Sequence, residues 1–210
     1  MRAPITVVTA SIPGREQLLG TTLASVYAQT VEVEAHLVMA QSCTEHLVPP
    51  HHVAIQQNWL LPAVRSEFTM RLADDDQLLP HHIETMLPHL DDYDVVYSYD
   101  ANGDRPRLDC TNWPQDQLVD TFRRQNWIDG SASAIRTSLL REVGGWPEDY
   151  VGGNHMTGEG GFVATGLPAE DWACYLNLAI AGARFLCIPE PTWRYGNGNW
   201  VRSSTHGWAP

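Results

Sequence analysis

Long apolar runs and paired cysteines are both missing from this sequence of 210 residues. No apolar run reaches the roughly 18 residues that a membrane-spanning helix needs, and the first residues lead directly into a strand-like segment without a signal-peptide core. We therefore expect no membrane span. The four cysteines are far apart and form no Cys-x-x-Cys pair, which indicates neither a zinc knuckle nor a disulfide framework. Reduced cysteines of this kind are typical of a cytoplasmic protein.

Basic residues are also few. The chain has 13 Lys and Arg residues against 25 Asp and Glu, which gives a formal net charge of -12. Because phosphate contacts rely on Lys and Arg, we expect no general affinity for nucleic acid or anionic lipid. The 43% of hydrophobic residues and 18% of charged residues are typical of a globular chain. The length fits one domain that covers residues 1–210.

The hydrophobic pattern alternates between strand-like and helix-like segments. The expected strands are residues 5–10, 35–39, 53–56, 68–73, 94–99 and 184–188. The expected helices are residues 16–27, a segment that opens at Pro80, and residues 115–124, 137–143 and 170–181. This alternation predicts an α/β fold with a mostly parallel sheet and with ligands at the carboxyl ends of its strands. Residues 151–166 are rich in glycine and predict a mobile loop, and residues 196–210 predict an irregular tail.

Three acidic residues, Asp74, Asp75 and Asp76, directly follow a strand-like segment. In extended chain, Asp74 and Asp76 would point to one side and Asp75 to the other. Two carboxylates on one side form a hard oxygen site, which suits Mg²⁺ or Mn²⁺ together with substrate phosphate oxygens. The alternative is that the three acids cap the helix near Pro80 in solvent.

Three segments together resemble the family 2 glycosyltransferases with the GT-A fold, over residues 5–195. Residues 5–30 (ITVVTASIPGREQLLGTTLASVYAQT) are similar to that family's opening strand and helix. Residues 72–80 (LADDDQLLP) are similar to its DxD segment. Residues 133–195 are similar to its acceptor half, through SAIRTSLLREVGGWPED, EDWACYLNLAIAGARFLCIPEP and WRYG. The order and spacing of the three segments carry the resemblance.

The resemblance implies a single GT-A domain, with a mostly parallel central sheet flanked by helices. Residues 1–100 would form the nucleotide-sugar-binding half and residues 101–210 the acceptor-binding half. It implies a metal-dependent, inverting transferase of hexosyl type, which moves a sugar from a nucleotide-diphosphate sugar to an acceptor hydroxyl. The acceptor stays open between a glycan, a lipid-linked sugar, a protein, a metabolite and a modified nucleobase.

The resemblance also implies roles for the acids. Asp76 would bind Mn²⁺ or Mg²⁺ directly, and Asp74 would contact the ribose or reach the metal through water, while Asp75 receives no definite role. The pair Glu170 and Asp171 matches the family's acidic pair, with Asp171 as general base and Glu170 orienting it or binding acceptor. The alternative is that both acids only cap the helix that follows.

The other candidate residues lie before and after these acids in the sequence. Thr9, Ser11 and Arg15 match the family's nucleotide-binding loop, and Arg65 matches a nucleotide-holding position before the DxD strand. The acids that in this family usually read the base after the second strand are missing here, so Gln41 or Ser42 would supply the hydrogen bonds to a base edge. His206 is a further metal candidate in the tail.

Aromatic and histidine residues complete the list. Trp127 and Trp146 border polar or glycine-rich sequence and are candidates for acceptor contact. The adjacent pairs His51–His52 and His81–His82 are expected at the surface. Two other functions stay open: a non-catalytic carbohydrate-binding or nucleotide-sugar-binding protein of the same fold, and a metal-dependent nucleotidyltransferase.

Overall fold

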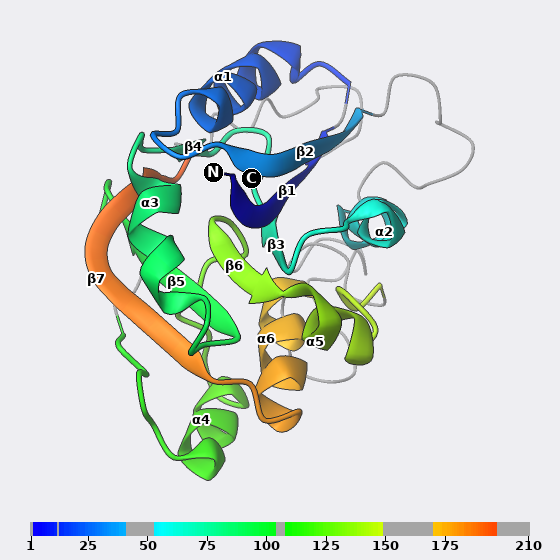
Figure 1. Cartoon of the computed structure of the whole chain (residues 1–210). Helices are drawn as coiled ribbons and strands as arrows, with labels where there is room; N and C mark the ends of the chain where they lie inside the picture. The colour runs from blue at the N-terminus through cyan, green and yellow to red at the C-terminus, as the bar shows by residue number, and fades with distance from the viewer. Residues whose placement is uncertain (1, 12, 41–52, 104–107, 149–169, 197–210) are drawn as a thin grey trace.

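A seven-stranded sheet forms the centre of the computed structural model, with strand order β2-β1-β3-β6-β5-β7-β4 (Figure 1). The structure describes residues 2–11, 13–40, 53–103, 108–148 and 170–196. The strands are β1 (Ala3–Ser11), β2 (Val33–Ala40), β3 (Phe68–Arg71), β4 (Gln77–Leu78), β5 (Val95–Asp100), β6 (Ser133–Arg136) and β7 (Phe185–Arg194). The α-helices are α1 (Glu16–Tyr27), α2 (Val53–Leu60), α3 (His82–Met86), α4 (Gln115–Phe122), α5 (Thr137–Glu142) and α6 (Glu170–Ile180). Short 3-10 turns, η1 (Leu61–Ala63) and η2 (Leu87–His89), follow α2 and α3.

The sheet is mixed, but most strands run in one direction. β1 pairs in parallel with β2 and β3, and β5 pairs in parallel with β7. β6 lies antiparallel between β3 and β5, and β4 is antiparallel to β7. Only β6 and β4, of the described strands, therefore oppose the others, so the carboxyl ends of β1, β2 and β3 meet at one edge.

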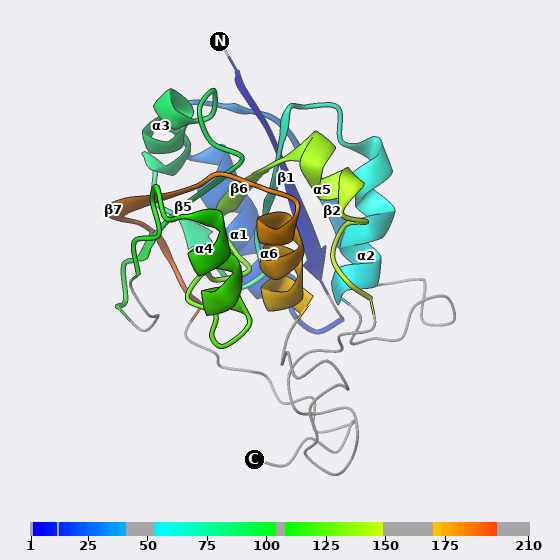
Figure 2. The ribbon, with the colours of Figure 1, turned by 90° about the horizontal axis from the view of Figure 1, so that it is seen from below.

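Helices cover both faces of the sheet, as the two views in Figures 1 and 2 show. One hydrophobic cluster joins Val7 of β1 to Val26 of α1 and Ile83 of α3. The other joins Val8 of β1 to residues of α2, α4, α5 and α6. Because successive strand residues point to opposite faces, Val7 and Val8 belong to different clusters. None of the helices in the described ranges is long and apolar enough to cross a bilayer.

Most expected elements are confirmed, and one is wrong. Residues 53–56 begin the helix α2 and not a strand, because Ala54, Gln57 and Leu61 are buried at helical spacing. The helix expected to open at Pro80 begins at His82. The short strands β4 and β6 were not anticipated by the hydrophobic pattern, since neither is long enough to show alternation.

His82 corrects a second expectation. It is fully buried and not at the surface, and its Nδ1 lies 2.6 Å from Oγ1 of Thr192 on β7. Burial lowers the pKa of His82 to about 3, so the ring is neutral at physiological pH. His51 and His52 lie outside the described residues.

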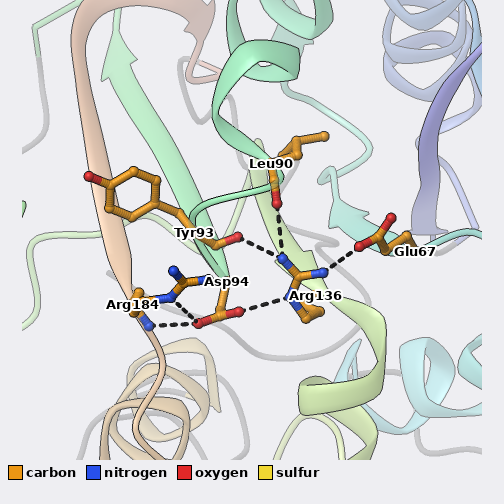
Figure 3. Close-up of polar contacts among 6 residues, drawn as sticks. All are labelled: Glu67, Leu90, Tyr93, Asp94, Arg136 and Arg184. Carbon is orange, nitrogen blue, oxygen red and sulfur yellow. Dashed lines mark hydrogen bonds and ion pairs between the residues drawn. The ribbon is translucent and has the colours of Figure 1, made fainter.

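An ion-pair network ties the amino ends of β3 and β5 to β6 and β7. Figure 3 shows its members, Glu67, Leu90, Tyr93, Asp94, Arg136 and Arg184. Arg136 donates to Asp94 Oδ1 over 2.8 Å, pairs with Glu67, and donates to two backbone carbonyl oxygens. Asp94 Oδ2 accepts the backbone N–H of Arg184 over 2.9 Å. One guanidinium thus holds three segments together at the edge opposite the carboxyl ends of β1 and β3.

We expect Arg136→Met to lower the free energy of unfolding by about 3 kcal/mol, because it removes the guanidinium that donates to Asp94 Oδ1 and to two backbone carbonyl oxygens. Urea denaturation followed by circular dichroism measures this loss. Arg123→Met is the matched control, since the Arg123–Asp120 pair is exposed and should contribute less than about 1 kcal/mol. Equal losses in the two variants would contradict a special role for Arg136.

Candidate active site

The candidate site lies where β1 and β3 end and β6 begins. β1 and β3 run in parallel, so the segments after Ser11 and Arg71 leave the sheet on the same side. Arg71 is paired with Ser133, the first residue of antiparallel β6, so the segment before β6 joins them there. Three chain segments that are distant in sequence therefore meet at this edge.

The Asp triplet occupies a turn and not an extended segment. The Asp76 N–H donates to the Ala73 carbonyl over 3.2 Å, which corrects the expected alternation of the three side chains. Arg15 Nη2 lies 3.1 Å from Asp74 Oδ1 and 2.6 Å from Asp75 Oδ2. Asp74 and Asp75 therefore share one guanidinium, while Asp76 has other partners.

The loop after β1 reaches the triplet as the motif predicts. Ser11 Oγ donates to Asp74 Oδ2 over 2.7 Å. Burial raises the pKa of Asp74, and the Ser11 hydroxyl and Arg15 oppose that rise. Thr9 is fully buried, and its hydroxyl lies 2.9 Å from Nε2 of His36 on β2. Thr9 therefore presents no exposed surface for a nucleotide, which corrects its expected role.

Asp76 is the most deeply buried acid of the triplet, with 1% of its surface exposed. Its Oδ1 accepts the backbone N–H of Gly196 over 2.7 Å. Burial raises the pKa of Asp76 to about 7, and the charges of Asp129 and Asp75 add to the rise. A Cβ on Gly196 would overlap the Asp75 backbone, so glycine is required for this close approach. The end of the WRYG segment thereby closes over the triplet.

Polar side chains on α1 hold the backbone of the triplet in place. Thr22 Oγ1 donates to the Asp76 carbonyl over 2.8 Å, and Ser25 Oγ accepts the Leu78 N–H over 3.1 Å. Gln29 donates to the Leu79 carbonyl over 2.8 Å. Thr22 and Ser25 lie on one face of α1, since they are three residues apart, and Gln29 follows just beyond the end of the helix. The polar residues at the end of this helix therefore position the acids.

The pair Glu170 and Asp171 opens α6 and faces the same region. Glu170 Oε1 forms an ion pair of 2.9 Å with Nη2 of Arg71 on β3. Asp171 Oδ1 accepts the N–H of the next residue, Trp172, over 2.7 Å, which satisfies one of the free N–H groups in the first turn of α6. Burial raises the pKa of Asp171 to about 7, and the neighbouring charge of Glu170 is the next cause. A carboxyl with such a pKa suits general base catalysis near neutral pH.

Residues 129–132, just before β6, connect the two acidic groups. The Ala132 N–H donates to the Arg71 carbonyl over 2.8 Å, and Ser131 Oγ accepts the Ala73 N–H over 2.9 Å. The charge of Asp129 raises the pKa of both Asp76 and Asp171. The triplet and the α6 acids therefore form one electrostatic centre.

Sequence reasoning missed Arg71 and Asp129. Arg71 stands immediately before the quoted LADDDQLLP segment, but its partner on α6 is remote in sequence. In the sequence, Asp129 and the following glycine indicate only a turn. The motif order alone thus carried no signal for either residue.

Three predicted residues lie away from this centre. Arg65 precedes β3, at the opposite end of the strand from the triplet, and its exposed guanidinium donates to the Pro62 carbonyl over 2.7 Å. Trp127 and Trp146 are only 5% and 2% exposed and belong to the hydrophobic core, so neither presents a ring face to an acceptor. This burial corrects their expected role. Gln41, Ser42, His206 and the glycine-rich residues 151–166 lie outside the described residues.

The carboxylates fit a hard divalent cation that takes further ligands from its substrate. Within the described ranges, no group of three or more His, Cys, Asp or Glu side chains gathers as a metal site. Mg²⁺ usually binds to proteins through one or two carboxylates and completes its shell with waters and phosphates. Asp74 and Asp76 are the two buried acids of the triplet and are the candidates to contribute such carboxylates.

Solved structures share this fold. The S. aureus TarS 1-349 structure gives a TM-score of 0.64 at 14% identity, over 92% of this chain and 60% of that chain. TarS 1-349 in complex with UDP-GlcNAc gives a TM-score of 0.64 at 12% identity, over 93% of this chain and 58% of that chain. The mannosyltransferase PcManGT from Pyrobaculum calidifontis, in complex with GDP-Man and Mn2+, gives a TM-score of 0.59 at 13% identity, over 93% of this chain and 57% of that chain. The chain has a glycosyltransferase fold of the GT-A type.

This likeness is one of structure. No family model matches the sequence, and no curated protein matches it. The chain spans about 60% of the length of the TarS 1-349 structure. The likeness therefore shows the fold, and a shared fold does not by itself determine the activity or the substrate.

Proposed function

We propose that this protein is an inverting glycosyltransferase, which moves a sugar from a nucleotide-diphosphate sugar to an acceptor hydroxyl. The observation that carries the proposal is the meeting of two acidic groups at one sheet edge, joined by Arg71 and residues 129–132. The Asp triplet suits the binding of a cation and a diphosphate, and the pair Glu170 and Asp171 suits general base catalysis. Structural neighbours that bind UDP-GlcNAc, and GDP-Man with Mn2+, support the choice of donor class.

The donor end of the proposed site is formed by the triplet and Arg15. Asp76 and Asp74 would hold Mn²⁺ or Mg²⁺, which when bound offsets the negative charge that develops on the leaving diphosphate. Arg15, already in contact with Asp74 and Asp75, adds a positive charge beside the same carboxylates. Thr22 on α1 would keep the triplet in position during this step through its bond to the Asp76 carbonyl, and Gln29 beyond α1 holds the segment that follows the triplet.

The acceptor end is formed by Asp171. Its carboxylate would take the proton from the acceptor hydroxyl while that oxygen bonds to the anomeric carbon. The bond between the anomeric carbon and the diphosphate oxygen breaks at the same time, so the configuration at carbon inverts. A binding protein of the same fold would have no use for such a base, and a nucleotidyltransferase would not need it opposite an acceptor hydroxyl.

A panel of UDP-sugars and GDP-sugars with Mn²⁺ tests the proposal. We expect one donor to raise the melting temperature in a metal-dependent manner, since a ligand at about 100 times its Kd adds about 2.7 kcal/mol to stability. The same donor should be slowly hydrolysed, and EDTA should abolish both effects. A panel that gave neither stabilisation nor hydrolysis would contradict the proposed function.

A further inference from the structure

Arg71 is buried at the centre of the site, and only part of its hydrogen-bonding capacity is used. Its side chain is 13% exposed, and Nη2 is paired with Glu170. Nε and Nη1 are buried and have no hydrogen-bond partner among the described residues. Buried guanidinium N–H groups are costly to leave unpaired, so the groups that surround Nε and Nη1 bear on the role of Arg71.

Nη1 of Arg71 lies close to Gly130. A Cβ built on Gly130 would lie 2.7 Å from Asp171 Oδ2 and 2.9 Å from Arg71 Nη1. Both atoms therefore approach the same point above the glycine backbone. Any side chain at this position would push Arg71 and Asp171 apart, which gives a physical reason for glycine between Asp129 and Ser131.

The charges around Asp171 come from three elements. They are Glu170 on α6, Arg71 on β3, and Asp129 in the segment before β6. Cys174 and Tyr175 on α6 also lie near Asp171 but are neutral, because burial raises the pKa of each. Arg71 is the one cation in this described set, and it faces two adjacent carboxylates. Although burial alone would lower it, Glu170 and Asp171 raise the pKa of Arg71, so the guanidinium keeps its charge.

We propose that Arg71 is a positioning residue for the Asp171 base: it holds Glu170 in an ion pair, and its Nη1 approaches Gly130 together with the Asp171 carboxylate, so that its positive charge acts on that carboxylate. This inference rests on the proposed function, because it presumes that Asp171 accepts the acceptor proton. Arg71 keeps Asp171 ionised near neutral pH by opposing the charges of Glu170 and Asp129.

The test is the pH profile of sugar transfer in Arg71→Met, Arg71→Lys and Glu170→Gln. Without the guanidinium, the profile of Arg71→Met should move to higher pH by about 1 unit or more, since an adjacent opposite charge typically shifts a carboxyl pKa by about 1–3 units. Arg71→Lys keeps the charge and should restore the midpoint. Glu170→Gln removes a negative neighbour and should move the profile to lower pH. Donor binding, measured by thermal shift with Mn²⁺, should not change in any of them.

Arg2→Met is the matched control, because it also breaks an Arg–Glu ion pair but on the exposed surface. Its pH profile should equal that of the wild type. An unchanged profile in folded Arg71→Met would overturn the inference, and if that variant does not fold, an unchanged profile in Glu170→Gln would do so. Wild-type protein that transfers no sugar would instead refute the proposed function, so the two failures are distinguishable.

Discussion

Asp171→Asn is expected to slow sugar transfer by about 10²–10⁴-fold, the usual contribution of a general base, while donor binding with Mn²⁺ is retained. Asparagine keeps the oxygen that accepts the Trp172 N–H, so the start of α6 should be preserved. Steady-state transfer kinetics and donor titration measure the two effects separately. In the wild type, transfer should rise with pH and level off above about 7, because the pKa of Asp171 is raised to about 7 and only the ionised form accepts a proton.

Asp116→Asn provides a closely matched control for this variant. Asp116 also lies in the first turn of a helix, α4, and its Oδ1 also accepts the N–H of the next residue, over 2.9 Å. It differs by being exposed and remote from Arg71. Asp116→Asn should therefore transfer sugar normally. If Asp171→Asn lost donor binding to the same degree as transfer, the acid would be a structural cap and not a base.

Asp76→Asn is expected to weaken metal-dependent donor binding by at least about 100-fold. Changes to residues that merely orient a metal ligand cost about 10–100-fold in affinity, and a ligand itself should cost no less. The amide oxygen can still accept the Gly196 N–H, so the local backbone should be kept. Calorimetric titration of donor in the presence of Mn²⁺, with a melting curve to verify folding, measures the effect.

Asp92→Asn removes one exposed carboxylate beyond α3 and controls for the change in net charge. It should bind donor with wild-type affinity. The role of Asp76 would be refuted by a folded Asp76→Asn variant that binds Mn²⁺ and donor as the wild type does. Hydrolysis of the donor, followed in parallel, should disappear with binding in that variant.

Local patterns in the sequence predicted many of the helices and strands. The helix expected over residues 16–27 is α1, because its apolar spacing and the preceding Pro-Gly turn are local signals. Tyr27, an aromatic residue at the end of this helix, is 80% exposed. Gln29, just beyond the helix, is buried instead, because its side chain binds the backbone near the triplet. Hydrophobicity alone could not show that polar groups fill that face.

Burial was the property that sequence reasoning judged least well. Trp127 was expected near an acceptor, but its ring stacks on Phe122 with centroids 4.3 Å apart, and its Nε1 donates to the Tyr97 hydroxyl over 3.2 Å. His82 was expected in solvent, but Thr192 of β7 partners it in the core. The hydrogen-bond partners Tyr97 and Thr192 both come from remote parts of the chain, so no pattern within either segment could reveal them.

The sequence by itself determined the class of fold, the acids of the triplet and the acidic pair at the start of α6. These features are local, since three adjacent carboxylates after a strand, or two at the start of a helix, can be recognised without knowing their neighbours. Only the tertiary structure decided how those acids are paired. Arg15 binds two members of the triplet, Arg71 reaches across to Glu170, and Asp129 lies between both groups. Such pairings depend on the strand order, which places β6 between β3 and β5, and strand order is a property of the whole folded chain.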